Sequence, residues 1–113
     1  MVEPTKADNN IFGLTGKKAV VTGAGRGIGK AVAMEWGPHE ILVNAVAPTF
    51  IETEMTRDML ADPQFRAYAL AKNVLKRFGT TDDVAGAVIY LASPAANLIT
   101  GHVLMVDGGW TAH

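Results

Sequence analysis

The sequence contains no cysteine and only one serine, Ser93, and both scarcities restrict its chemistry. Without thiols the chain has neither a disulfide framework nor a thiolate metal site. Three histidines, His39, His102 and His113, are scattered and show no spacing typical of metal ligands. The sequence therefore predicts no metal site, and the histidines are expected at the surface or capping helices.

Charge of one sign and long apolar runs are also lacking. Ten basic and 11 acidic residues give a formal charge of -1, which leaves no basic surface for nucleic acid or an anionic membrane. No apolar run approaches the roughly 20 residues that span a membrane, and the polar first ten residues do not look like a secretion signal. We expect a cytoplasmic protein that binds neither nucleic acid nor membranes.

Short apolar strands alternate with helical segments along the chain. We expect strands at 18–22, 41–46 and 102–106, and helices at 28–36, 52–60, 63–76 and 81–91. Asp62 is the expected N-cap before Pro63, and Thr81 supplies a capping hydroxyl. The alternation predicts an α/β fold with a parallel sheet of about three strands flanked by helices. Residues 1–12 are expected to form a flexible head.

A glycine-rich loop is the sharpest motif. Thr22-Gly23-Ala24-Gly25-Arg26-Gly27-Ile28-Gly29 stands between a predicted strand and a predicted helix. Gly23 permits a tight turn, Gly27 lets the backbone approach a pyrophosphate, and Gly29 lets helix and strand pack closely. A glycine pattern alone is weak evidence, because it is also typical of an ordinary turn. Its position between strand and helix favours a phosphate-binding loop.

Further motifs agree with this loop. They are Asn44-Ala45-Val46-Ala47-Pro48, Ile51-Glu52-Thr53-Glu54-Met55, Arg77-Phe78-Gly79 with Asp82-Asp83-Val84-Ala85, and Thr100-Gly101 with Val106-Asp107-Gly108-Gly109. With the loop, they resemble the short-chain dehydrogenase/reductase family over nearly every residue from Gly13 onward. The tail at 108–112 is similar to the gluconate 5-dehydrogenase and 3-oxoacyl-carrier-protein reductase branches. The resemblance implies a Rossmann-like fold and hydride transfer between NAD or NADP and a small-molecule carbonyl or alcohol.

The resemblance also implies which residues contact the cofactor. The phosphates or ribose would contact Gly23, Arg26, Gly27 and Ile28. The nicotinamide carboxamide would contact Ile51 and Thr53, and Pro48 would lie beside the nicotinamide ring. Thr49 stands where the family usually has glycine, which is a departure in the same loop. Because the walls for adenine and ribose are missing, we expect NAD or NADP binding to be weak or absent.

The family's catalytic region is not found. Family members place a catalytic serine and a Tyr-x-x-x-Lys motif before the sixth strand, whereas here only residues 30–40 lie between the glycine loop and that strand. The junction falls near 31–33, dividing one Rossmann-like remnant at 13–113 into a cofactor-loop segment, 13–33, and a C-terminal segment, 34–113. A natural deletion, an engineered deletion or an incomplete sequence would each produce such a junction.

One copy of Tyr-x-x-x-Lys does occur, at Tyr68 to Lys72. The spacing places a phenol and an ammonium on one helical face. This copy follows the sixth strand instead of preceding it, and no serine lies before it. We interpret it as part of an ordinary lid helix and predict no catalytic residue in this chain.

The sequence thus predicts a family oxidoreductase that lacks its catalytic Ser-Tyr-Lys region and is inactive alone. One alternative is an active enzyme whose missing region is supplied by another chain or is absent only from this sequence. Another alternative is a non-catalytic remnant that binds copies of itself or a partner. By resemblance, the helix at 82–91 and the strand at 102–106 form a subunit interface, so we expect a homo-oligomer. An exposed strand edge at 41–46 is expected to favour pairing with another chain.

Overall fold

The computed structural model describes residues 13–22 and 26–113, and the side chains of residues 26–29 lie outside this description. The head predicted at 1–12 lies outside it as well. The chain forms two compact units. The first comprises the described part of Met1–Ala45 with Leu91–Val103, and the second comprises Val46–Tyr90 with Leu104–His113.

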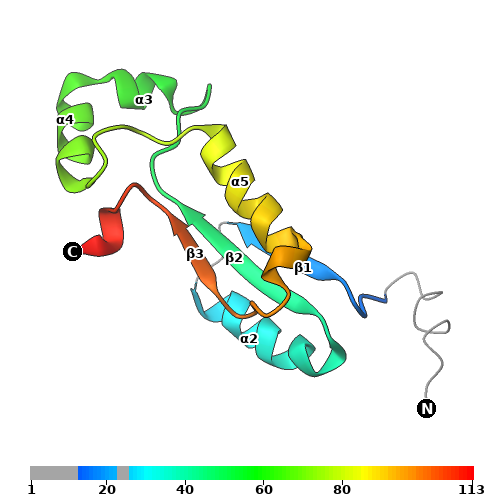
Figure 1. Cartoon of the computed structure of the whole chain (residues 1–113). Helices are drawn as coiled ribbons and strands as arrows, with labels where there is room; N and C mark the ends of the chain where they lie inside the picture. Colours follow the sequence, from blue (N-terminus) through cyan, green and yellow to red (C-terminus); the bar gives the residue numbers. More distant parts are fainter. Residues whose placement is uncertain (1–12, 23–25) are drawn as a thin grey trace, which may run out of the picture. The chain divides into compact units, whose positions relative to one another are not determined.

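Strands and helices alternate in the predicted order (Figure 1). Strands β1 (Lys18–Thr22), β2 (Leu42–Pro48) and β3 (Val103–Val106) form one sheet in the order β1-β2-β3. Helices are α2 (Arg26–Trp36), α3 (Arg57–Ala61), α4 (Pro63–Lys72) and α5 (Thr81–Ala92), with single 3-10 turns η1 (Gly37–His39), η2 (Pro94–Ala96) and η3 (Trp110–Ala112). Backbone partners advance together, from Val43 with Gly101 to Thr49 with Val106, as in a parallel sheet. The predicted α/β fold is confirmed.

Strand β2 lies in the middle of the sheet, so the prediction of an exposed edge at 41–46 is wrong. The edges are β1 and β3. Four consecutive residues of β2, 43–46, are buried, because a central parallel strand has neighbours on both sides. The strand also continues beyond the predicted end at Val46 to Pro48. Proline is tolerated there as the last strand residue, and the Thr49 amide resumes the pairing by donating to the Val106 carbonyl at 3.3 Å.

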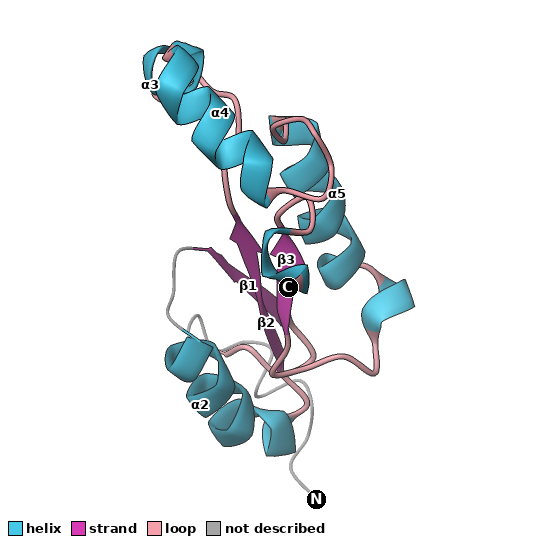
Figure 2. Cartoon of the chain, turned by 90° about the vertical axis from the view of Figure 1, so that its left-hand side faces the viewer, coloured by secondary structure: helices cyan, strands magenta, loops and turns pink. Residues whose placement is uncertain are grey.

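In the first unit, helix α2 packs against strands β1 and β2 (Figure 2). Ala33 of α2 meets Ile41 and Val43 in a buried cluster. Partly buried side chains surround it: Ala19, Val21, Val32 and Trp36. Trp36 is therefore a packing residue.

Polar side chains fix the connection from η2 to β3 in this unit. The buried Asn44 amide donates to the Ile99 carbonyl at 2.9 Å and accepts from the His102 amide at 3.0 Å. Lys18 Nζ donates to the Ser93 carbonyl at 2.5 Å and to Asn97 Oδ1 at 2.6 Å. Asn44 is satisfied within the unit, which explains how a polar amide is accommodated in a central strand.

In the second unit, α3 and α4 form a hairpin within residues 52–78, which we call the lid segment. Its core is a buried cluster of Leu60, Ala69 and Phe78, against which Phe50, Phe65 and Leu70 pack. The predicted N-cap is confirmed, because Asp62 Oδ2 accepts from the Phe65 amide at 3.2 Å. Pro63 occupies the first helical position, where its missing N–H costs no helical hydrogen bond.

Both lid helices are shorter than predicted because side chains compete for backbone groups. Thr56 Oγ1 accepts from the Thr53 amide at 2.9 Å and donates to the Ile51 carbonyl at 2.6 Å, which forms a turn where helix was expected. Helix α3 therefore begins at Arg57. Helix α4 ends at Lys72, where Lys76 Nζ donates to the Leu70 carbonyl at 2.9 Å.

Helix α5 starts where predicted, but its cap is Thr80 and not Thr81. Thr80 Oγ1 accepts from the Asp83 amide at 3.3 Å, and Asp83 Oδ2 accepts from the Thr80 amide at 2.8 Å. This reciprocal pair is a capping box. Two successive threonines made the capping position ambiguous in the sequence.

The turn after β3 depends on Asp107 and two glycines. Asp107 accepts from the Thr111 hydroxyl at 2.6 Å and from the amides of Gly109 and Thr111 at 3.0 Å each. The Thr111 hydroxyl, ahead of the backbone amides, lowers the pKa of the Asp107 carboxyl. Gly108 and Gly109 have φ angles of 61° and 91°, which favour glycine.

We predict that Gly109→Ala destabilises the second unit. A Cβ at Gly109 would lie 2.6 Å from the Val74 Cβ, and the backbone is already left-handed. The expected loss is roughly 1–3 kcal/mol in the free energy of unfolding, measured by urea denaturation.

Gly86→Ala is the matched control, because nothing lies within 4 Å of its added Cβ on α5. It should stabilise by about 0.5–1 kcal/mol, since alanine is the better helix former. Equal effects of the two substitutions would contradict the steric account.

Candidate functional site

The glycine loop follows β1 and leads into α2 in the first unit, as predicted. Gly23 lies outside the described residues. The backbone of Arg26, Gly27 and Ile28 forms the first turn of α2, whereas their side chains are outside the description. The first turn of a helix presents unpaired backbone amides. The contact of these four residues with phosphate remains a prediction.

The other three candidates follow one another at the end of β2, in the second unit. Pro48 is the exposed last residue of the strand, and Ile51 and Thr53 are half-buried. Ile51 forms a parallel bridge with Gly79, in which the Glu52 amide donates to the Gly79 carbonyl at 2.9 Å and the Gly79 amide to the Phe50 carbonyl at 3.0 Å. The bridge leaves the Ile51 amide without a hydrogen bond in the described part of the chain.

The hydroxyl of Thr53 has a defined role in its turn. Thr56 Oγ1 gives its proton to the Ile51 carbonyl, so the 3.2 Å contact between the two hydroxyls requires Thr53 to donate. Thr53 Oγ1 also accepts from the Thr56 amide at 3.3 Å. One lone pair is left for a ligand. Thr53 Oγ1 can therefore accept a hydrogen bond from a ligand. The Ile51 backbone amide, two residues earlier, can donate one.

Tyr68 and Lys72 do meet on α4, as their spacing predicts. Lys72 Nζ donates to the Tyr68 hydroxyl at 2.9 Å and lies 5.3 Å from the centroid of the Trp110 ring. Trp110 packs at 5.3 Å from the Phe50 ring, and His113 Nε2 contacts the Lys72 carbonyl at 2.9 Å. The cluster joins the C-terminal turn to α4. Its contacts match a packing role for Trp110 and a capping role for His113.

An ion pair closes the end of the lid segment. Arg77 donates to Asp83 Oδ2 at 2.9 Å, and Asp83 also accepts from the Thr80 amide and hydroxyl. The Arg77 hydrogen bond, followed by the Thr80 amide, lowers the pKa of the Asp83 carboxyl to about 2. Asp83 in turn raises the pKa of the Arg77 guanidinium. Both side chains are accessible to solvent, so the pair is expected to be sensitive to salt.

Two pockets of the second unit differ in their relation to the predicted residues. A pocket of about 490 Å³ is lined by Asn73, Arg77, Asp83 and the 105–109 segment but by none of the candidates. A pocket of about 380 Å³ includes Thr53 together with Arg57 and Arg66, which the sequence analysis did not single out. These arginines are nine positions apart, and only the α3–α4 hairpin brings them to one pocket.

Within residues 13–22 and 26–113, no group of three or more His, Asp or Glu side chains is arranged to hold a metal ion. In the same described ranges no helix is both long and apolar enough to cross a membrane.

We predict that stability falls as the pH drops from about 4 to about 2, because protonation of Asp83 breaks the pair with Arg77. The pKa of Asp83 in the folded chain is about 2, below its ordinary value of 3.8. The pair therefore stabilises the fold fully above pH 3.8, and this stabilisation is lost as the pH falls to about 2. Carboxyl carbon NMR shifts of Asp83 should titrate near 2. Arg77→Gln should move the midpoint upward, and a wild-type midpoint near 3.8 would contradict the pairing.

Most of this chain is similar in sequence to known proteins. The profile of the family described as enoyl-(acyl carrier protein) reductase matches residues 14–111. Gluconate 5-dehydrogenase of Gluconobacter oxydans is 37% identical over 89 residues, which are 79% of this chain and 35% of that protein. Galactitol 2-dehydrogenase of Rhizobium johnstonii is 46% identical over 82 residues, or 73% of this chain and 32% of that protein.

Solved structures agree with the fold. The crystal structure of a gluconate 5-dehydrogenase from Burkholderia cenocepacia in complex with NADP and tartrate matches with a TM-score of 0.78 and 27% identity. The match covers 87% of this chain and 46% of that one. The chain spans about a third of the length of the curated relatives it matches. Because the family profile extends over almost the whole sequence, the chain belongs to the enoyl-(acyl carrier protein) reductase family of short-chain dehydrogenases/reductases.

Proposed function

We propose that this chain is the cofactor-loop and C-terminal part of an NAD(P)-dependent oxidoreductase that interconverts a carbonyl and an alcohol, and that the 113 residues alone are inactive. The observation that carries the proposal is the pairing of a free donor and a free acceptor after β2. The Ile51 amide donates, and Thr53 Oγ1 accepts. The relatives' names, two of them dehydrogenases, support the reaction class.

The residues after β2 fit a nicotinamide carboxamide. A carboxamide has one carbonyl oxygen that accepts and an amino group that donates. The Ile51 amide would hold the carbonyl oxygen, Thr53 Oγ1 would hold the amino group, and the exposed Pro48 would lie beside the ring. For the glycine loop of the first unit, taken by itself, the resemblance implies contacts of Gly23, Arg26, Gly27 and Ile28 with phosphate or ribose. When bound, the nicotinamide supplies or receives the hydride.

The positions of Tyr68 and Lys72 support the proposed inactivity. The catalytic tyrosine and lysine of the family precede the strand that corresponds to β2, whereas Tyr68 and Lys72 follow it, in the lid segment. Lys72 also contacts Trp110, and its peptide carbonyl contacts His113, so α4 is tied to the C-terminal turn. Tyr68 therefore has a structural explanation that requires no reaction.

We predict weak NADPH or NADH binding that depends on the glycine loop. Gly27→Val should abolish it, because a side chain would keep the backbone from the pyrophosphate. Thr53→Val should weaken it about two- to tenfold by removing one hydrogen bond. Isothermal titration calorimetry on the full chain measures both effects.

Thr53→Ser is the matched control, because it keeps the hydroxyl and should bind like the unchanged chain. Tight binding that Gly27→Val leaves unaltered would contradict the phosphate loop. Turnover of NADPH with a carbonyl substrate, abolished by Tyr68→Phe, would contradict inactivity and make Tyr68 catalytic.

A second candidate function is a non-catalytic remnant that associates with copies of itself or with a partner. Helix α5 favours it, since Ile89 is 67% exposed on that helix and Tyr90 is 43% exposed. Large apolar side chains exposed on one helix are typical of an interface. Self-association through α5 and the edge strand β3 is therefore our proposal for the assembly.

We predict that Ile89→Glu shifts the assembly toward monomer, because burial of a charge in the interface is costly. The expected weakening of association is on the order of tenfold or more, measured by analytical ultracentrifugation at micromolar concentration. Gln64→Glu adds the same charge on the exposed start of α4 and should have no effect. A folded monomer in the unchanged chain would overturn the proposal.

A further inference from the structure

The smaller pocket of the second unit combines an apolar floor with a charged rim. It has a volume of about 380 Å³ and is lined by Glu52, Thr53, Arg57, Leu60, Ala61 and Arg66. Leu60 is buried at 3% exposure and belongs to the lid core. The two guanidinium groups come from different helices, α3 and α4. The pocket is therefore built by the hairpin and not by a single helix.

Neither guanidinium has an acidic partner among the residues that the structure describes. Within the described residues, Arg57 and Arg66 form no side-chain hydrogen bond and no ion pair. Arg77, by contrast, pairs with Asp83 at 2.9 Å. Asp62, which lies between the two arginines in sequence, uses a carboxylate oxygen to cap α4. Each guanidinium offers five N–H donors in a planar fork, so two forks remain available to an anion.

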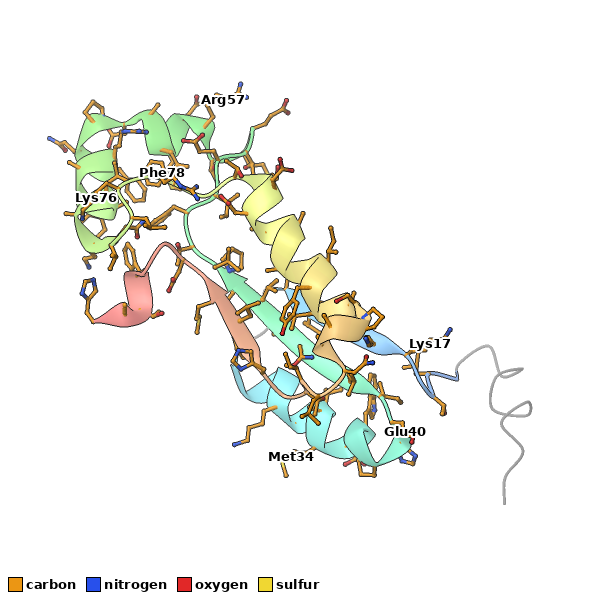
Figure 3. The ribbon with its side chains drawn as sticks, in the orientation of Figure 1. Lys17, Met34, Glu40, Arg57, Lys76 and Phe78 are labelled. Atoms are coloured by element: carbon orange, nitrogen blue, oxygen red, sulfur yellow. The ribbon has the colours of Figure 1, made fainter. Side chains whose placement is uncertain are left out.

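The core of the lid segment positions one of these forks. The Arg66 guanidinium lies 5.1 Å from the centroid of the Phe78 ring, close enough for a cation–π contact. Phe78 is only 4% exposed and shares the buried cluster with Leu60. Figure 3 labels Phe78 in the lid segment and Arg57 on α3, the helix that also carries Leu60. The same buried cluster thus contacts Arg66 and supplies the pocket floor.

The charges of the pocket favour a monoanion with hydroxyl groups. Two guanidinium groups and the Glu52 carboxylate leave a formal charge of about +1 at neutral pH, which suits a carboxylate better than a doubly charged phosphate. The Glu52 carboxylate is an acceptor, and a hydroxyl group is the donor that satisfies it. The same Glu52 would repel a second negative charge on the ligand.

We propose that the Arg57–Arg66 pocket binds the carboxylate of a hydroxy acid, with a ligand hydroxyl donating to Glu52. This inference rests on the proposed function and deepens it, because it names a carboxylate-bearing substrate for the same oxidoreductase. Thr53 also lines this pocket, and its one free lone pair stays assigned to the expected carboxamide.

The experiment titrates the full chain with sodium D-gluconate, with the uncharged D-glucitol and with inorganic phosphate, by calorimetry and by NMR of the arginine Nε–H groups. D-gluconate should bind and shift the Arg57 and Arg66 signals, and D-glucitol should not. Arg57→Gln and Arg66→Gln should each weaken gluconate binding about tenfold, the loss expected for a charge-assisted hydrogen bond. Both side chains are exposed, so the variants are expected to stay folded.

Lys17→Gln is the control, since it removes one exposed positive charge from the first unit and should leave gluconate affinity unchanged. An equal loss in Lys17→Gln, tighter binding of phosphate than of gluconate, or no gluconate binding would each overturn the proposal.

NADPH titrations separate this result from the proposed function. The arginine variants should bind NADPH as the unchanged chain does, whereas Gly27→Val should not. If gluconate does not bind and NADPH binding still depends on Gly27, only the proposal of a carboxylate site is wrong. If Gly27→Val leaves NADPH affinity unchanged while both arginine substitutions weaken gluconate binding, the cofactor proposal is wrong and the proposal of an anion pocket is supported.

Discussion

Two backbone hydrogen bonds of the Ile51–Gly79 bridge hold the ends of the lid segment together, and the features of the second unit depend on them. A Cβ at Gly79 would lie 2.5 Å from Ile51 Cδ1, so a larger residue at this position would require the Ile51 side chain to move. The bridge uses the neighbours of Ile51 for its hydrogen bonds and so leaves the Ile51 amide free. The Thr53–Thr56 turn follows directly after it. The lid segment therefore leaves the sheet and returns to it at one place.

Local signals in the sequence predicted much of the fold. The β-branched run at 18–22 gave β1 at its observed bounds, and Asp62-Pro63 marked the start of α4. These succeeded because burial of an apolar strand and capping of a helix depend on adjacent residues. The order of strand and helix then limited the architecture to a parallel sheet.

Features that depend on distant residues were not predictable in the same way. The central position of β2 depends on both partners, β1 and β3, and the short run at 41–46 carries no sign of it. The start of α3 was misplaced because Thr56 bonds backward to Thr53 and Ile51. The Arg57–Arg66 pocket needs the hairpin geometry, and its only sequence signal is two arginines on either side of a predicted helix break.

The positions of the two tryptophans have a spectroscopic consequence. Trp36 packs in the first unit against Ala33, Ile41 and Val43, and Trp110 lies in the second unit beside Phe50 and the Lys72 ammonium. Each unit thus contains its own intrinsic fluorophore, in a different electrostatic surrounding. Replacing either indole by phenylalanine would leave emission from a single unit, so the order in which the two units lose their structure during unfolding can be followed without any external label.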